Sequence, residues 1–403
     1  MTTPSRRPTL GRNVIALSAV SFLTDVSSEM IYPLLPIFLT TTLGASASFI
    51  GAIEGAAEST AALLKLASGW WSDRVRQRKP LVVLGYGLAT VVRPLVALAT
   101  SASQVLVIRL ADRVGKGIRT APRDALIAES VNASVRGRAF GFHRAADHAG
   151  GVLGPLIAFA VLSWQLAPLR TVFWLAAIPG VLSFVVLCVF VRDVPRVVQP
   201  RSSAPDLSQP LPRSFWRVLG VLFLFTLGNS TDAFLLLRAT QLGVPIAMAP
   251  ILWAALHVVK SASSTHGGAL SDRIGRRPAL VMGWTLYAAV YLGFARATEP
   301  WHAWALFGVY GIYFGLTEGA ERALIADLVS PERRGTAYGW FSLAIGLGAL
   351  PASLLFGQVW DRAGAPTAFA MGAAIALTAV VGLLATGASR DPGLAPQSHG
   401  NRI

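Results

Sequence analysis

One segment of the chain carries charges at helical spacing inside an apolar region. It reads RLADRVGKGIRTAPRDALIAE and covers residues 109–129. Arg109, Arg113 and Lys116 are spaced i, i+4 and i+7, so a helix places them on one face. A charge at the centre of a membrane helix costs at least about 2.5 kcal/mol. We therefore expect this face to line a wet cavity or to meet acids, and we interpret the three bases as candidate substrate-binding residues.

Acidic residues lie in other apolar stretches of the chain. Asp25 and Glu29 are one helical turn apart, and so are Glu54 and Glu58. A carboxyl group in such a place can change its protonation near neutral pH, as a proton-coupled carrier requires. We expect at least one of these acids to cycle a proton, with Glu29 and Asp25 the leading candidates. The alternative is a permanent network of ion pairs that only sets the packing.

Further polar residues extend the candidate substrate site. His143 and Asp147 are spaced i, i+4, which also permits a divalent metal, but Arg144 beside them would repel a cation. We therefore expect no metal site. The complete set of expected substrate-binding residues is Arg109, Arg113, Lys116, His143, Asp147, Asp232 and Tyr310.

The composition tells which kind of protein must position these residues. Of the 403 residues 53% are hydrophobic and 14% are charged, whereas soluble domains have about 25% charged residues. The net charge of +15 does not indicate nucleic acid, because the basic residues lie between apolar runs, as membrane loops require. There is no nucleotide-binding loop, H-E-x-x-H zinc motif or nucleophile elbow, so we do not expect an enzyme.

Apolar runs long enough to cross a membrane need about 20 residues. Twelve are predicted, at 13–39, 47–71, 80–100, 104–127, 138–163, 170–191, 215–238, 245–268, 278–297, 302–326, 336–358 and 366–387. Lys and Arg number 21 on one side of this topology and four on the other, which places both termini in the cytoplasm. We expect two six-helix bundles, 1–191 and 215–403, the second with a short cytoplasmic tail, and a cytoplasmic linker at 192–214.

The two halves repeat each other in sequence. ALIAESVNASVRGRAFG at 125–141 aligns without gaps on ALIADLVSPERRGTAYG at 323–339, with nine of seventeen positions identical. The loop GWWSDRVRQRKP at 69–80 aligns on GALSDRIGRRP at 268–278. Both halves run in the same direction, so the pattern predicts a parallel repeat around a site near the membrane midplane.

With this loop motif in both halves, the chain resembles the major facilitator superfamily. The resemblance implies an all-α membrane fold of twelve transmembrane helices in two pseudo-symmetric six-helix bundles. It also implies a gating role for the loop residues and a proton-coupling role for Arg113, in R-x-x-K-G. The expected gating residues are Gly69, Asp73, Arg74, Gly268, Asp272 and Arg273. The helix 5 segment partly resembles the antiporter motif of drug exporters through Gly141, Gly150, Gly154 and Pro155.

These observations predict a secondary active transporter that works by alternating access in the inner membrane. We expect proton-coupled efflux, by antiport, of a small organic or amphiphilic solute with an anionic group. The alternatives are proton-coupled uptake or export of an anionic metabolite, divalent metal transport, and a receptor without transport. The proton gradient is the expected energy source, without a cofactor. The expected partners are a small-molecule substrate and the bilayer, not nucleic acid, and we expect a monomer.

Overall fold

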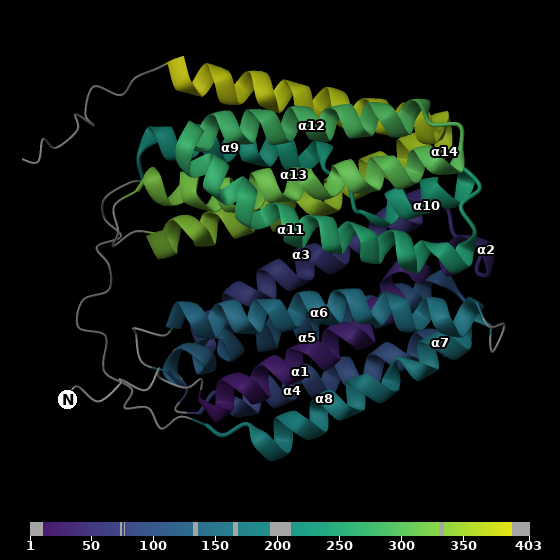
Figure 1. Ribbon diagram of the computed structural model, residues 1–403, viewed down its shortest axis with the longest axis vertical. Helices are drawn as coiled ribbons and strands as arrows, with labels where there is room; N and C mark the ends of the chain where they lie inside the picture. Colours follow the sequence, from purple (N-terminus) through teal and green to yellow (C-terminus); the bar gives the residue numbers. More distant parts are fainter. Residues whose placement is uncertain are drawn as a thin grey trace, which may run out of the picture.

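The computed structural model describes residues 11–72, 75, 77–131, 136–163, 168–193, 211–329 and 334–388. Long helices form nearly all the regular structure of these residues and lie side by side (Figure 1). The first half contains α1 (Arg12–Ile31), α2 (Leu35–Thr41), α3 (Ala47–Ser72), α4 (Lys79–Val92), α5 (Ala102–Glu129), α6 (Arg136–Ser163), α7 (Leu169–Leu175) and α8 (Ala177–Phe190). The second half contains α9 (Arg213–Gly228), α10 (Ala233–Gln241), α11 (Ala249–Ile274), α12 (Arg276–Arg296), α13 (Pro300–Asp327) and α14 (Arg334–Ala388).

Several expected spans consist of more than one helical piece. Pro33 lies in the short 3₁₀ turn Tyr32–Leu34 between α1 and α2, and Pro94 begins the change from α4 to the 3₁₀ segment Arg93–Leu98. A proline removes one backbone donor and crowds the preceding turn, which interrupts a helix at these points. In α14, Gly364 has φ 82° and ψ 163°, so the chain bends there. This bend lies between the expected spans 336–358 and 366–387.

Within the described residues, eight helical segments are long and apolar enough to cross a membrane. One of them, Ala337–Thr386, contains the bend and covers two of the expected spans. Three further expected spans correspond to α3, α5 and α13; charged residues lie in the middle of α3 and α5 and in the C-terminal third of α13. Each of the twelve expected ranges therefore coincides with helical structure, and the all-α membrane fold is confirmed.

The helices form two groups that follow the order of the chain (Figure 1). In the first group α1 packs on α6 and α8, and α5 packs on α3 and α4. In the second group α13 packs on α11 and α12, and α14 packs on α9 and α12. The groups meet mainly where α3 contacts α14 and where α6 contacts α11.

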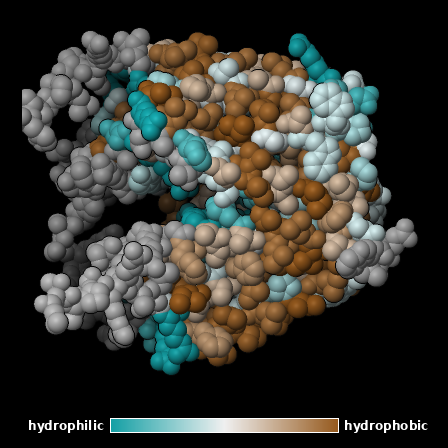
Figure 2. All heavy atoms as spheres, in the orientation of Figure 1, coloured by the Kyte–Doolittle hydropathy of each residue, from teal (hydrophilic) through white to brown (hydrophobic). Residues whose placement is uncertain are grey.

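The outer surface is largely hydrophobic, as a lipid-facing surface requires (Figure 2). Val91, Val107 and Val381 are each about two-thirds exposed on this surface. Figure 2 also shows a hollow between the two groups, which opens at one end of the molecule. We call this end the open end; there Asn13 donates hydrogen bonds to Ser130 (3.1 Å) and to the carbonyl oxygen of Arg192 (2.8 Å).

Candidate functional site

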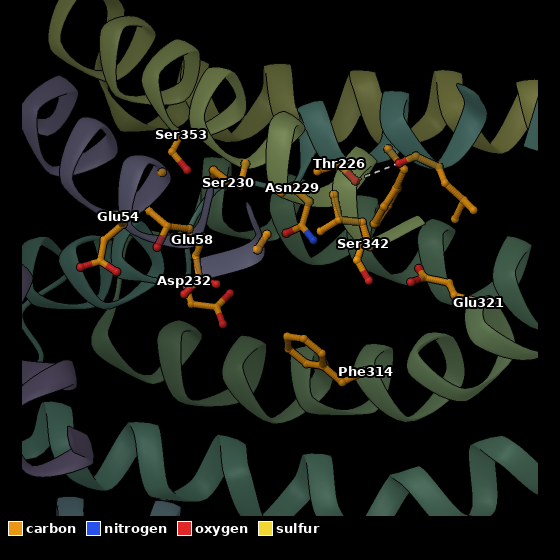
Figure 3. A pocket seen from close by; sticks show the side chains of 18 of the residues that line it. Glu54, Glu58, Thr226, Asn229, Ser230, Asp232, Phe314, Glu321, Ser342 and Ser353 are labelled. Atoms are coloured by element: carbon orange, nitrogen blue, oxygen red, sulfur yellow. Dashed lines mark hydrogen bonds between the residues drawn. The ribbon is translucent and has the colours of Figure 1, made fainter. Parts of the chain in front are cut away.

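A cavity of about 560 Å³, the central cavity, lies between the two groups of helices. Its walls come from α3 on one side and from α9, α13 and α14 on the other, together with residues 229–232. Figure 3 shows polar side chains from both groups at its walls, including Glu58, Asp232 and Ser342. The volume is typical of sites for small organic ligands, which are about 300–1,000 Å³.

The charged face of α5 points toward the interior of the first group, as its spacing predicts. Arg109 donates to both carboxylate oxygens of Glu54 on α3, from Nε at 3.0 Å and from Nη2 at 2.6 Å. Neither side chain is more than 10% exposed. Two parallel charge-assisted hydrogen bonds fix both groups. Arg109 and Glu54 therefore satisfy each other's charge and hydrogen-bonding groups, and this pair joins α5 to α3.

A second buried ion pair joins α5 to the 3₁₀ segment after α4. Arg93 Nη2 donates to Asp112 at 2.9 Å, and both side chains are 8% exposed. The other terminal nitrogen of Arg93 donates to the carbonyl oxygen of Thr24 at 3.1 Å and to the hydroxyl of Ser27 at 3.0 Å. Arg93 is thus fully engaged with α1 and α5, which assigns it a structural role.

The third pair on α5 is looser than the first two. Nη2 of Arg113 lies 3.2 Å from Glu58, whose side chain is 50% exposed in the central cavity. The Nε atom of Arg113 is buried and has no hydrogen-bond partner among the described residues. Arg113 therefore has an unused donor near a partner that solvent can reach.

A smaller pocket of about 70 Å³, the basic pocket, adjoins this pair. Its walls include Asp25 and Glu29 from α1 and Arg113, Lys116 and Arg119 from α5. Arg119 stacks on Tyr86, 4.3 Å from the ring centre, and its buried Nη1 has no partner in the described part of the chain. Arg93, Arg109 and Asp112 line the pocket as well, each held in one of the two buried ion pairs. The pocket thus brings the two leading proton-coupling candidates close to several bases, of which Arg119 was not predicted.

Glu29 also contacts the opposite group of helices. Its Oε2 accepts a hydrogen bond of 2.7 Å from the indole nitrogen of Trp253 on α11. Trp253 packs on Tyr32, with ring centres 5.0 Å apart. The sequence did not predict this hydrogen bond, because a tryptophan in an apolar helix is most often a packing residue.

The seventh expected span is broken where it passes the central cavity. α9 ends at Gly228 and α10 begins at Ala233, and the residues between them are Asn229, Ser230, Thr231 and Asp232. The hydroxyl of Tyr310 donates to Asp232 at 2.7 Å. Both residues line the central cavity, and their role in substrate binding stays a prediction. Discontinuous helices at the membrane midplane are a common feature of substrate sites in transporters.

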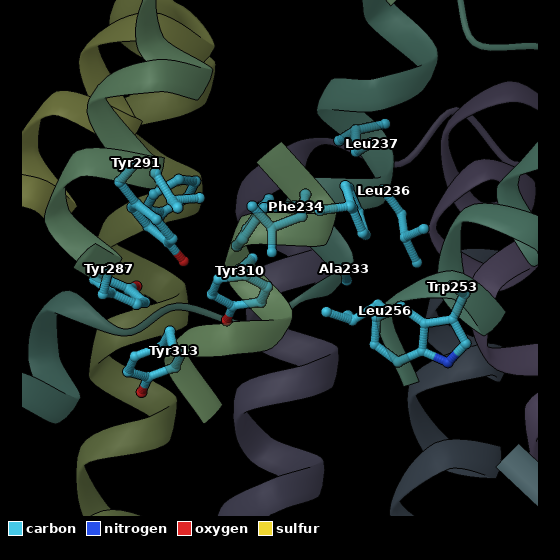
Figure 4. Close-up of a cluster of buried hydrophobic side chains, with 14 of the residues drawn as sticks. Ala233, Phe234, Leu236, Leu237, Trp253, Leu256, Tyr287, Tyr291, Tyr310 and Tyr313 are labelled. Atoms are coloured by element: carbon cyan, nitrogen blue, oxygen red, sulfur yellow. The ribbon is translucent and has the colours of Figure 1, made fainter. Parts of the chain in front are cut away.

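Aromatic side chains support this break (Figure 4). Tyr287 donates to the carbonyl oxygen of Gly228 at 3.0 Å, which satisfies a backbone group that the broken helix leaves free. Tyr287 stacks on Tyr291 with ring centres 4.2 Å apart, and Tyr310 stacks on Tyr313 at 5.5 Å. Tyr291, Tyr310 and Tyr313 make hydrogen bonds with residues 229–232, and Tyr310 and Tyr313 also line the cavity.

The glycines of the helix 5 motif are packing positions between α6 and α1. A Cβ atom on Gly150 would lie 2.6 Å from the carbonyl oxygen of Phe22, and one on Gly154 would lie 2.6 Å from that of Val26. Pro155 follows inside α6, and Gly141 lies near its start. Small residues at these positions allow α6 to approach α1 closely behind Asp25 and Glu29.

His143 and Asp147 do not line either the central cavity or the basic pocket. His143 is 1% exposed, and its Nε2 lies 3.8 Å from Asp147, which also approaches Arg144 at 3.5 Å. In the described residues, no three His, Cys, Asp or Glu side chains form a group that could hold a metal ion.

The expected gating residues are only partly described. Asp73 and Arg74 lie outside the described residues, and so does the side chain of Asp272. Gly69 packs near Ala121, Gly268 has open space around it, and Arg273 is exposed. These contacts do not test a gating role.

The end opposite the open end, the closed end, has a contact that the sequence analysis missed. The carboxylate of Asp361 on α14 accepts hydrogen bonds from the backbone nitrogens of Ala47 (2.9 Å) and Ser48 (2.8 Å), at the start of α3. The hydroxyl of Ser48 donates to it as well. Close below, a Cβ atom on Gly51 would lie 2.1 Å from the carbonyl oxygen of Ser353, so the two helices are nearly in backbone contact.

Comparison with known proteins gives the family. The family model of the Major Facilitator Superfamily matches residues 17–319 and 239–401. The chain belongs to this superfamily. It is 36% identical over 357 residues to an uncharacterised MFS-type transporter of Methanocaldococcus jannaschii, covering 87% of this chain and 89% of that protein. The protein is therefore a transporter and not an enzyme.

Two further matches are less extensive or more distant. Multidrug resistance protein MdtH of Cronobacter sakazakii is 33% identical over 112 residues, which is 26% of this chain and 28% of that protein. The crystal structure of a bacterial homologue of the human lysosomal transporter Spinster, inward-facing and unoccupied, superposes with a TM-score of 0.72. That pair is 19% identical and covers 93% of this chain and 95% of the other.

Proposed function

We propose that this transporter exports a small organic or amphiphilic solute with an anionic group in exchange for protons. The observation that carries the proposal is the basic pocket: Asp25 and Glu29 lie beside Lys116 and Arg119, and no ion pair within 4 Å joins these four residues. Carboxyl groups without a basic partner are free to bind and release a proton, and bases without an acidic partner are free to bind an anion.

The proposed movement is alternating access by two rigid halves. The halves are residues 1–191 and 215–403, joined by the linker 192–214, most of which lies outside the described residues. The central cavity reaches solvent at the open end, and Asp361 joins α14 to α3 at the closed end. We propose that the open end faces the cytoplasm and that the protein resides in the inner membrane, because the basic loops are expected on that side.

The five expected proton-coupling residues differ in how well they fit that role. Glu54 is held by Arg109 through two hydrogen bonds, which favours a permanent charge. Glu58 has only one contact with Arg113. Asp25 and Glu29 fit best, since they line a pocket beside bases with which they form no ion pair in the described structure. Glu29 also contacts the second half through Trp253, so its surroundings change when the halves move.

Export rather than uptake has two sources of support. One is the likeness to a multidrug resistance protein over about a quarter of the chain. The other is the partial antiporter motif, whose Gly150 and Gly154 pack directly behind the acids of α1.

Reconstitution into liposomes with a trapped pH indicator tests the proposal. An outward gradient of a transported aromatic carboxylate should drive protons in the opposite direction to the solute. Asp25→Asn and Glu29→Gln should abolish this movement, whereas Glu299→Gln, outside both cavities, should not. Protons that move with the solute would establish the anion-uptake alternative, and transport without any proton movement would refute proton coupling.

A further inference from the structure

We propose that the substrate is a zwitterion that separates the Glu58–Arg113 ion pair. Its anionic group binds Arg113 at the basic pocket, and its ammonium group binds between Glu58 and Asp232 in the central cavity. This inference rests on the proposed function, because it adds a cationic group to the anionic group already proposed.

The Glu58–Arg113 pair is the one on α5 that a ligand can open. The Arg109–Glu54 and Arg93–Asp112 pairs are at most 10% exposed and have at least one contact shorter than 3.0 Å. In contrast, Arg113 meets Glu58 through one nitrogen at 3.2 Å, and half of the Glu58 side chain is exposed. The unpartnered Nε of Arg113, a residue only 9% exposed, is a donor that a carboxylate or phosphate can occupy together with Nη2.

Asp232 supplies a second acceptor for a cation in the central cavity, beside the carboxylate of Glu58. Both carboxylates line the cavity, and Figure 3 shows them from the two groups of helices. Tyr310 donates one hydrogen bond to Asp232, and no ion pair within 4 Å joins Asp232 to a base among the described residues. Lys260 instead forms an ion pair of 3.0 Å with Glu318.

The ring of Tyr310 completes the cation site, because it lines the same cavity as the two carboxylates. Phe314 and Tyr32 line this cavity too, but Lys260 already lies 3.8 Å from the ring centre of Phe314 and Arg109 lies 5.6 Å from that of Tyr32. A cation over the face of an aromatic ring is attracted by the ring, and more strongly when water is excluded. The phenol of Tyr310 is also the donor to Asp232, so its ring lies next to the carboxylate.

Charge balance favours a zwitterion over an ion of one sign. A purely anionic ligand on Arg113 would leave Glu58 without a base and near Asp232. A purely cationic ligand on Glu58 would leave Arg113 without an acid. Each case leaves a charge unpaired, and the cost is larger for Arg113, which is 9% exposed, than for the half-exposed Glu58. A zwitterion replaces one ion pair by two and leaves no new unpaired charge.

Matched ligands test this inference on the purified transporter. We choose three scaffolds, phenylalanine, O-benzyltyrosine and 2-aminododecanoic acid, each as the zwitterion, as the N-acetylated anion and as the cationic amide. Binding is measured by titration of intrinsic fluorescence. On at least one scaffold the zwitterion should bind ten-fold or more tightly than both derivatives. If no zwitterion binds, or if the N-acetylated anion binds as well on every scaffold that binds, the inference is wrong.

Two variants separate recognition of the cation from general damage. Asp232→Asn should lower the affinity for the zwitterion to that of the N-acetylated anion, with Glu299→Gln as the control that keeps the preference. Glu58→Gln should increase the affinity for the N-acetylated anion by up to about five-fold, because the anion no longer breaks a half-exposed ion pair. A misfolded variant cannot gain affinity. If Glu58→Gln gives no gain, the inference is wrong. The proposed function fails instead if no ligand with an anionic group is transported, or if protons do not move in the opposite direction to the solute.

Discussion

The carboxylate of Asp361 accepts hydrogen bonds from both the backbone nitrogen and the hydroxyl of Ser48. Asp361 lies on α14 in the second half, and Ser48 lies in the first turn of α3 in the first half. An acidic side chain at a helix N-terminus satisfies free N–H groups and is favoured by the helix dipole. Here the capping residue belongs to the other half, so the cap exists only while the closed end is closed.

Removing this cap should favour opening of the closed end. Asp361→Ala removes all the acceptors, and loss of an N-cap costs about 0.5–2 kcal/mol, or about 2–30-fold in the equilibrium between states. Spin labels at positions 42 and 362, with Cys188 replaced, should show a larger population of long distances. Asp361→Asn keeps one oxygen acceptor and should have a smaller effect. Identical distance distributions in Asp361→Ala and the parent would contradict the prediction.

Glu54 and Glu58 should differ sharply on substitution. Glu54→Gln leaves Arg109 buried without its acid, and breaking a buried pair costs about 3–5 kcal/mol. Glu58→Gln disrupts a half-exposed pair, worth about 1 kcal/mol or less. Thermal unfolding in detergent should therefore show a large decrease in Tm for Glu54→Gln and a small one for Glu58→Gln. Equal decreases would refute the distinction.

Glu29 should be needed for proton coupling but not for substrate exchange. Glu29→Gln keeps the size of the side chain and can still accept from Trp253, but it cannot bind and release a proton. We expect loss of transport driven by a pH gradient, with counterflow of labelled substrate retained. Trp253→Phe should weaken the coupling without abolishing it, because it removes only the hydrogen bond of 2.7 Å. Full gradient-driven transport by Glu29→Gln would place the proton site elsewhere.

The glycines of α6 should be required for packing. Gly154→Ala places a Cβ atom 2.6 Å from the carbonyl oxygen of Val26. Overpacking of this kind costs about 1–3 kcal/mol, so Tm should fall. Gly319→Ala in α13 is the matched control, since nothing lies within 4 Å of its Cβ position and alanine favours a helix. A Tm for Gly154→Ala equal to that of the control would contradict this prediction.

The sequence predicted the elements of this site better than its contacts. The helical spacing of Arg109, Arg113 and Lys116 correctly required acidic or wet surroundings, because charge in an apolar helix has few acceptable places. The same reasoning treated Glu54 and Glu58 as equivalent, one turn apart. Their different partners and exposures depend on how α3 packs against α5, which a pattern within one helix does not contain.

Contacts between the halves were the hardest to predict. Trp253 and Asp361 each bind a residue more than 200 positions away. The sequence around a tryptophan in an apolar helix does not indicate whether its indole nitrogen has a hydrogen-bond partner. A single acid between two expected spans, such as Asp361, indicates a partner only weakly. Helix capping is recognised in sequence only when the capping residue and its helix are adjacent.

Two ion pairs of α5 limit how strongly the membrane voltage acts on the movement of the first half. Both partners of the Arg109–Glu54 and Arg93–Asp112 pairs belong to the first half of the chain. When that half moves, the two opposite charges of each pair move together, so the pair moves no net charge along the electric field of the membrane. A voltage of 100 mV does about 2.3 kcal/mol of work on one charge that crosses the membrane fully, and almost none on such a pair. The electrical work of a transport cycle is then set by the net charge of the solute and the protons exchanged for it.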